Sequence, residues 1–203
     1  MESGMFQAGK VLLSSLISTF GTVYIAANSV ANTLNNIGWT VVGSLSTVLL
    51  TVVGQCIGAG ETQQAKAYTK RFLKLGSIMV VVLFGSVFLL RHPLVRMFNF
   101  GPETLKEAAY FTGAGALFTI ASVYGLAFVP VAAFRAAGDV RYAMILAIGS
   151  MFTFRVGLSY LLHYVWELGL LSVWIGMWAD WTFRSVVNAI HFHRGKWLTK
   201  KVI

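Results

Sequence analysis

The sequence from residue 11 to residue 60 reads VLLSSLISTFGTVYIAANSVANTLNNIGWTVVGSLSTVLLTVVGQCIGAG, and it contains no Asp, Glu, Lys, Arg or His. A transmembrane helix uses about 20 apolar residues, so this stretch is too long for one membrane crossing and long enough for two. Gly21, Thr22 and the asparagine-rich residues after Ala27 offer a break between the two helices. The stretch therefore predicts an integral membrane protein.

The composition of the whole chain supports the same class. Of its 203 residues, 57% are hydrophobic and only 11% are charged, whereas soluble domains carry about 25% charged residues. Six helices of about 20 residues would leave roughly 80 residues for loops and ends, with no room for a soluble domain. The single cysteine, Cys56, excludes an internal disulfide, and the absence of a Cys/His cluster argues against a structural metal site.

The apolar segments predict an all-α integral membrane protein with six transmembrane helices. We place these spans at about residues 5–20, 27–53, 72–90, 108–134, 142–162 and 168–192. Gly54, Gly58 and Gly60 are expected to end the second span in a turn, and Pro93 marks the stop of the third. Pro130 is expected to kink the fourth span or unwind its last turn, because proline removes a backbone donor.

The basic residues predict the orientation of these spans, because Lys and Arg are retained on the cytoplasmic side. One side of the membrane would carry ten of them: Lys66, Lys70, Arg71, Lys74, Arg135, Arg141, Arg194, Lys196, Lys200 and Lys201. The other side would carry Arg91, Arg96 and Lys106. Both termini are therefore predicted to be cytoplasmic. We attribute the net charge of +9 to this orientation in the membrane, and we expect no nucleic-acid partner.

The first span is short, since 16 residues extend about 24 Å against a hydrocarbon core of roughly 30 Å. No signal peptide explains the start, because Glu2 stands where a basic region would be. We expect that the chain begins partway into a helix that is longer in an intact protein. A tilted helix or a locally thinned bilayer is the alternative.

Several motifs resemble the MATE family of multidrug and toxin extrusion transporters. They are ESGMFQAGK at residues 2–10, AANSVAN at 26–32, VGQCIGAG at 53–60, FRAAGDVR at 134–141 and GMWADWTFR at 176–184. Their order and spacing resemble the second half of that family only, although they span nearly the whole chain.

The resemblance implies a fold and a function. MATE proteins have twelve helices in two six-helix lobes, so the six spans would correspond to the second lobe, with the first lobe absent. The function implied is membrane transport, in which a cation-coupled antiporter exports small organic, cationic compounds in exchange for sodium or protons. The expected partners are membrane lipid and a first lobe or a second copy of the chain, in the cell membrane, with no cofactor beyond Na⁺ or H⁺.

Two candidate site residues come from this resemblance. Glu2 matches a membrane-embedded glutamate that is implicated in cation coupling in the NorM-like branch. Tyr124 stands where that branch has an aspartate, which leaves the coupling mode open. A tyrosine there could present its aromatic face to a cationic substrate or pack between helices.

Three asparagines form a further candidate site. Asn28, Asn32 and Asn35 step by four and three residues, so they lie on one face of the second predicted helix. This polar stripe would either line a cleft and bind substrate or ion, or hydrogen-bond to neighbouring helices.

Three charged residues lie inside predicted spans, where an unpaired charge costs at least about 2.5 kcal/mol. Arg155 and Asp180 are predicted to lie at the same depth on neighbouring helices, and Arg184 follows Asp180 by one turn. A proton or ion relay is one reading. A structural contact between Arg155 and Asp180 is favoured, since two arginines would keep the carboxylate ionised.

No catalytic motif accompanies these residues, and we predict no enzyme. Two alternatives to a multidrug exporter stay open. One is a lobe of the related lipid-linked oligosaccharide flippases, which a strongly cationic cleft in the missing lobe would favour. The other is a membrane remnant that does not transport.

Overall fold

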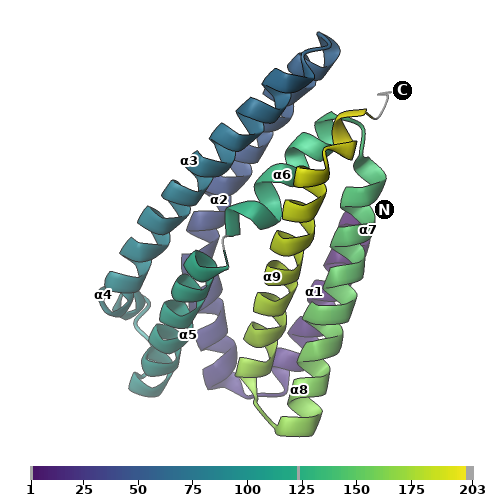
Figure 1. Cartoon of the computed structure of the whole chain (residues 1–203). Coiled ribbons are helices and arrows are strands. Elements are labelled where there is room, and N and C mark those ends of the chain that lie inside the picture. The colour runs from purple at the N-terminus through teal and green to yellow at the C-terminus, as the bar shows by residue number, and fades with distance from the viewer. Residues whose placement is uncertain (1, 123, 200–203) are drawn as a thin grey trace.

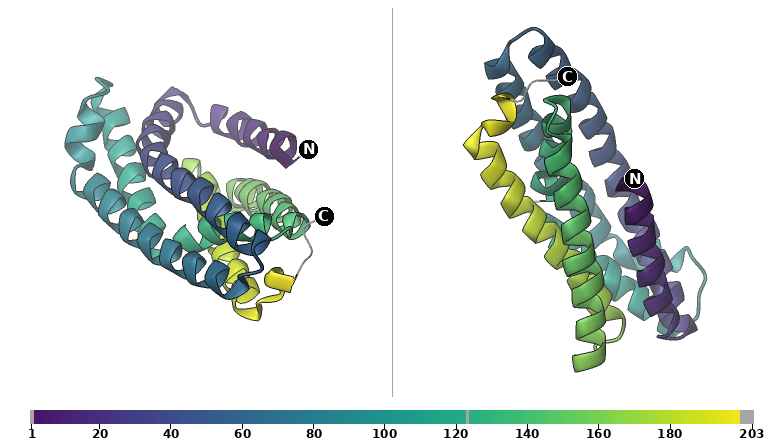
Figure 2. Two further views of the ribbon diagram at one scale, coloured as in Figure 1. Left: turned by 90° about the horizontal axis from the view of Figure 1, so that it is seen from above. Right: turned by 90° about the vertical axis from the view of Figure 1, so that its right-hand side faces the viewer.

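The structure is a computed structural model that describes residues 2–122 and 124–199, without the side chains of Glu2, Ser3, Tyr124 and Thr199. The described residues form helices and connecting turns and no strand (Figures 1 and 2). The elements are α1 (Glu2–Ser18), α2 (Thr22–Gly58), α3 (Thr62–Leu89), α4 (Arg91–Arg96), α5 (Pro102–Ala121), α6 (Tyr124–Ala136), α7 (Val140–Ser150), the π-helix η1 (Met151–Leu158), α8 (Ser159–Trp166), α9 (Leu170–Arg194) and the 3₁₀-helix η2 (Lys196–Thr199).

The helices cross the bundle in alternating directions. The α2–α3 turn, the α6–α7 turn and the C-terminal end of α9 lie at one end, whereas the α1–α2 turn, α4 and the α8–α9 turn lie at the other (Figure 1). By length and composition, α2, α3 and the continuous helix Val140–Trp166 could each cross a membrane, and α5 with α6 adds a fourth, bent crossing. With α1 and α9 these make the six-helix, all-α membrane bundle that the sequence predicts.

The second span is longer than the sequence suggested. The break falls at Gly21, whose φ of 94° favours glycine, and α2 then runs without interruption through the asparagines to Gly58. The asparagines do not break the helix, because Asn32 Nδ2 donates to the carbonyl of Asn28 within the same helix at 2.9 Å. The sequence also predicted that the helix ends in a glycine-rich turn starting at Gly54. The helix instead continues to Gly58, and the turn lies at Gly60, where φ is 78°.

The fourth span bends, but not at its proline. The axes of α5 and α6 differ by 58°, and the bend lies between Ala121 and Tyr124, while α6 continues through Pro130 to Ala136. The last turn of the span therefore does not unwind at Pro130, whereas a kink within α6 at this proline stays a prediction. Pro130 cannot donate to the carbonyl of Leu126, four residues earlier. The side chain of Asn188 reaches this part of α6. Its Nδ2 donates to Ala127 O at 2.9 Å and, at the longer distance of 3.5 Å, to Leu126 O.

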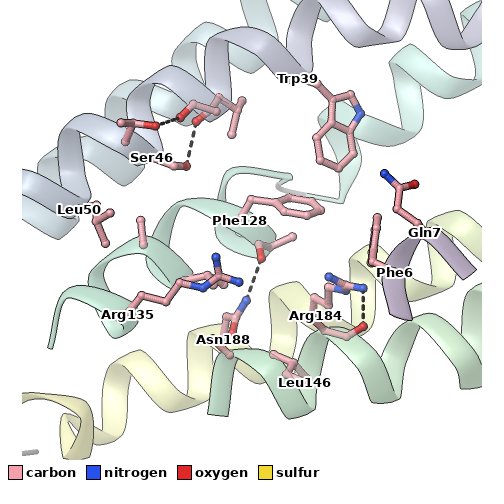
Figure 3. Close-up of a pocket in the computed structure, with 18 residues that line it drawn as sticks. Phe6, Gln7, Trp39, Ser46, Leu50, Phe128, Arg135, Leu146, Arg184 and Asn188 are labelled. Carbon is pink, nitrogen blue, oxygen red and sulfur yellow. Dashed lines mark hydrogen bonds between the residues drawn. The ribbon is translucent and has the colours of Figure 1, made fainter. Parts of the chain in front are cut away.

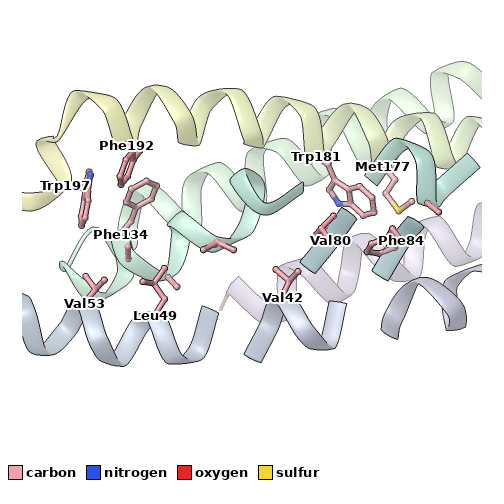
Figure 4. Close-up of a cluster of buried hydrophobic side chains, with 14 of the residues drawn as sticks. Val42, Leu49, Val53, Val80, Phe84, Phe134, Met177, Trp181, Phe192 and Trp197 are labelled. Carbon is pink, nitrogen blue, oxygen red and sulfur yellow. The ribbon is translucent and has the colours of Figure 1, made fainter. Parts of the chain in front are cut away.

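Large apolar side chains lie both inside and outside the bundle. The main internal cluster joins α2, α3, α6, α9 and η2 through residues such as Leu49, Phe84, Phe134, Trp181 and Trp197 (Figure 4). The outer surface of α3 exposes Ile78, Val81 and Val82, each by more than half. An apolar exterior of this kind fits a lipid environment.

Candidate transport cavity

Two cavities lie between the helices of the bundle. The first, which we call the arginine cavity, has a volume of about 480 Å³ and is lined by residues of α1, α2, α6, α7 and α9, including Arg135, Arg184 and Asn188 (Figure 3). The second, the asparagine cavity, has a volume of about 410 Å³ and is lined by residues of α1, α2, η1 and α9. Phe6 and Trp39 line both, so the two cavities are neighbours.

Aromatic rings lie where the two cavities meet. The ring centroid of Trp39 is 4.7 Å from that of Phe128 and 5.7 Å from that of Trp181, in edge-to-face arrangements. The guanidinium of Arg184 lies 6.0 Å from the centroids of Phe6 and Phe128. Such a group of ring faces can contact flat organic molecules and cations.

Arg184 is fixed by a buried ion pair. Its Nε donates to Asp180 Oδ1 at 2.8 Å, and its Nη2 donates to Ala147 O of α7 at 3.0 Å. Asp180 is fully buried and Arg184 is 6% exposed, so the carboxylate neutralises the guanidinium away from water. The pair connects α9 to α7 and holds the arginine at the wall of the arginine cavity.

The contact expected between Arg155 and Asp180 is not formed. The backbone of Arg155 lies beside Gly176, one turn before Asp180 on α9. Asp180 pairs with Arg184 instead, and its Oδ2 has no hydrogen-bond partner among the described residues. The predicted depth was therefore right to within about one helical turn, but the partner was wrong, because Arg184 lies on the same helix face as Asp180.

All three predicted asparagines line the asparagine cavity, together with Arg155. Asn32 Nδ2 bonds to Asn28 Oδ1 at 3.0 Å, whereas Asn35 is 6% exposed and its Oδ1 has no hydrogen-bond partner in the part of the chain described. Trp174 also lines this cavity and is 1% exposed, and its Nε1 has no hydrogen-bond partner among the described residues. Buried polar atoms without a partner are uncommon in folded proteins, so these two atoms mark a polar end of the cavity lining.

The shorter half of the bent span forms one wall of the arginine cavity. Two polar side chains of α9 bond to this span: Ser185 Oγ donates to Ser122 O at 3.1 Å, and Asn188 donates to Ala127 O. Asn188 also accepts a bond from Tyr142 Oη of α7 at 3.0 Å. Helices that are interrupted in mid-membrane form the binding sites of many transporters, where neighbouring side chains satisfy the freed backbone groups.

Two predicted site residues, Glu2 and Tyr124, can be located only by their backbone. Glu2 is the first residue of α1, one turn before Phe6, and Tyr124 is the first residue of α6. Their side chains lie outside the described part of the structure, so their roles stay predictions.

Several residues that line the cavities were not predicted from the sequence. Trp39 and Ser46 continue the face of α2 that carries Asn32 and Asn35, so the same helical spacing could have identified them. Nor was a partner predicted for His191, whose Nε2 lies 2.8 Å from Asp139 Oδ2 across the end of the bundle. No group of three His, Cys, Asp or Glu residues that could hold a metal occurs within residues 2–122 and 124–199.

Comparison with known proteins decides the family. The sequence model of the family MatE matches residues 1–161, which is more than half of the chain. The chain belongs to the MATE family. All 203 residues align at 24% identity with the "Probable multidrug resistance protein NorM" of Thermotoga maritima, and 95% of the chain aligns at 23% identity with the "Probable multidrug resistance protein YoeA" of Bacillus subtilis.

Solved MATE structures share the fold. An outward-facing multidrug resistance MATE family transporter matches 98% of this chain with a TM-score of 0.86 at 17% sequence identity. The chain corresponds to 45% of that transporter and to 43% of the Thermotoga maritima relative. It therefore spans less than half the length of these relatives and has the architecture of one lobe of a MATE-like transporter.

Proposed function

We propose that the chain forms the second lobe of a cation-coupled antiporter that exports small organic, cationic compounds. The observation that carries the proposal is the six-helix lobe, which matches less than half of MATE transporters and has two neighbouring cavities between its helices. In a two-lobed transporter the substrate path runs between the lobes, and one bundle moves against the other around a site near the membrane midplane. The first lobe of the same transporter or a second copy of the chain would supply the opposing wall.

The aromatic rings support binding of an organic cation. The partly exposed rings of Trp39 and Phe128 lie at the boundary between the cavities, where a flat cation gains both apolar burial and cation–π attraction. Sodium or a proton would be coupled through Glu2, by its match to the family's acidic position. A carboxylate at membrane depth either binds a cation or takes up a proton, and both make it a coupling group.

We further propose that the protein lies in the cell membrane with both termini in the cytoplasm. The α2–α3 turn, the α6–α7 turn and the end of α9 lie at one end of the bundle, and most basic residues flank them (Figure 1). Single cysteines at Lys66 and Glu103, introduced in a Cys56→Ser background, should label from opposite sides of sealed vesicles. Labelling from one side would contradict this orientation.

The transport experiment compares the chain with and without a first lobe. Residues 1–203 are expressed in cells that lack their own exporters, alone or with the first half of the Thermotoga maritima relative, and accumulation of a fluorescent organic cation is followed. We expect export only with the first lobe, driven by a sodium or proton gradient and abolished by Glu2→Gln. Gradient-driven export by the chain alone would refute the need for a second lobe. Absence of export in both cases would favour a lobe that does not transport.

A second candidate is a lobe of a lipid-linked oligosaccharide flippase. The described side chains that line the two cavities include Lys10, Arg135 and Arg155, besides Arg184, whose charge Asp180 neutralises, and none of the described lining residues is acidic. A basic lining suits the phosphates of such a lipid better than it suits a cation. In the same cells, rescue of a flippase-deficient strain without export of the organic cation would favour this candidate.

A further inference from the structure

A basic groove lies on the outside of the bundle, separate from the two cavities. It has a volume of about 730 Å³ and lies between the end of α3, the short helix α4 and the part of α5 from Pro102 to Leu117. The side chains that characterise it are Arg91, His92, Arg96, Lys106, Tyr110 and Leu117. Figure 1 shows α4 and the start of α5 at the end of the bundle opposite the α2–α3 turn.

The charge of this groove is unusual for its position. The other two connections at this end, residues 19–21 and 167–169, contain no Lys or Arg. Arg91, Arg96 and Lys106 are therefore the basic residues of these connections, and all three line the same groove. Because the non-cytoplasmic side of a membrane protein is normally poor in Lys and Arg, three of them in one groove need an explanation other than topology.

Two nearby acidic residues do not form ion pairs with these basic residues. Glu103 and Glu107 lie on α5 but do not line the groove, and neither forms an ion pair with a described residue. Arg96 and Lys106 are exposed and likewise have no ion-pair partner among the described residues. The groove is thus open and positively charged.

Arg91 is held against the floor of the groove. Its Nη1 donates to Phe88 O at 2.7 Å, and its guanidinium lies 4.4 Å from the centroid of the Phe88 ring. Its stem crosses Gly113 of α5, where an added Cβ would lie 2.8 Å from Arg91 Cδ. The missing side chain at Gly113 lets the arginine lie flat, with its remaining N–H groups available to a ligand.

The groove continues into an apolar surface along α5. Tyr110 and Leu117, two turns apart, are 57% and 50% exposed, and the neighbouring Leu89 and Met97 are 76% and 80% exposed. A ligand that complements both parts has an anionic head and an apolar chain. We propose that this groove binds an anionic phospholipid, with its phosphate among Arg91, Arg96 and Lys106 and an acyl chain along Tyr110 and Leu117.

The test measures lipid retention by the purified full chain. Native mass spectrometry compares phosphatidylglycerol with phosphatidylcholine of the same acyl chains, for the wild type, for Arg96→Gln/Lys106→Gln, and for the matched control Lys70→Gln/Lys74→Gln. The control removes two exposed charges from the other end of the bundle. We expect the wild type and the control to prefer phosphatidylglycerol by about tenfold and the groove variant to lose most of that preference.

Each other outcome contradicts the proposal. Equal retention of both lipids by the wild type, or an unchanged preference in the groove variant, would overturn it. Inorganic phosphate is added in a further arm to separate a lipid from a free anion. We expect it to leave phosphatidylglycerol bound, because it lacks the apolar contacts. Displacement of the lipid by equimolar phosphate would show a phosphate site and not a lipid site. Circular dichroism confirms that the variants keep the helical content of the wild type.

Discussion

Helix α9 packs against two neighbouring spans in two different ways. Toward the bent span α5–α6 it uses neutral polar side chains, since Ser185 and Asn188 donate to backbone carbonyls on either side of the bend. Toward the continuous span α7–η1–α8 it uses a close backbone approach at Gly176 and the buried Asp180–Arg184 pair, whose arginine donates to Ala147 O. The same helix thus supports the bent span by neutral hydrogen bonds, and supports the continuous span by close packing, by a charged pair and by the bond between Tyr142 and Asn188.

The difference shows where an interrupted helix is tolerated in a membrane. Carbonyl groups freed at a bend have no water to bind in the bilayer core, so another helix must supply donors. The continuous span does not need them, and even its π-helical segment is helped locally, because Ser159 Oγ donates to Arg155 O at 2.6 Å within the same span. The bend lies beside the arginine cavity, where movement of α6 would change the shape of the cavity.

The largest effect is expected from Asp180→Asn. This change leaves the buried guanidinium of Arg184 without its counter-charge and should lower the stability of the folded protein by about 3–5 kcal/mol. Thermal unfolding in detergent and the yield of folded protein measure it. The double variant Asp180→Asn/Arg184→Gln should lose less than the sum of the two single changes. Additive losses would show that the pair does not couple.

Asn188→Leu tests the hydrogen-bonded side of the comparison. It leaves Ala127 O and the hydroxyl of Tyr142 without the bonds that Asn188 makes, and we expect a loss of about 2–4 kcal/mol in unfolding experiments. The control is Thr182→Val, on the exposed face of the same helix, where only a bond to Trp178 O is lost. Its effect should stay within about 0.5 kcal/mol. Equal effects of the two changes would mean that the bent span does not depend on α9.

Gly176→Ala tests the close-packed side. The added Cβ would collide with Ser159 Oγ and lie 3.0 Å from Phe154 O, so we expect a loss of about 1–3 kcal/mol. Combining it with Ser159→Ala removes the colliding oxygen and should recover part of the loss in the same unfolding assay. If the double variant is no more stable than Gly176→Ala alone, the two helices do not meet at this point.

The class of fold could be predicted from the sequence because apolar runs report membrane crossings directly. The ends of the helices could not. Pro130 and the asparagine-rich residues after Ala27 were interpreted as signals that break a helix. The asparagines instead bond within α2. Asn188, 58 residues after Pro130, supports the helix that contains this proline. These compensations depend on contacts between residues that lie one turn or one helix apart, which composition and spacing alone do not reveal.

The candidate site, like the fold, could be predicted only in part from the sequence. The polar stripe of Asn28, Asn32 and Asn35 was identified from helical spacing, and the structure places all three on one cavity. The ion-pair partner of Asp180 was predicted wrongly as Arg155. Two arginines were candidates, and Arg184, on the same helix as Asp180, forms the pair. Whether these residues bind substrate or ion stays a prediction.

The central claim is that the cavities between the helices of this lobe are accessible to water and to an organic cation. Single cysteines at Asn32 and Ser46, one in each cavity, are compared in a Cys56→Ser background with Val81→Cys on the outer face of α3. We expect a water-soluble thiol reagent to label both cavity positions in nanodiscs, and a fluorescent organic cation to protect them, while Val81→Cys stays unlabelled. Labelling that is absent from both cavity positions, or unaffected by the cation, would contradict the claim.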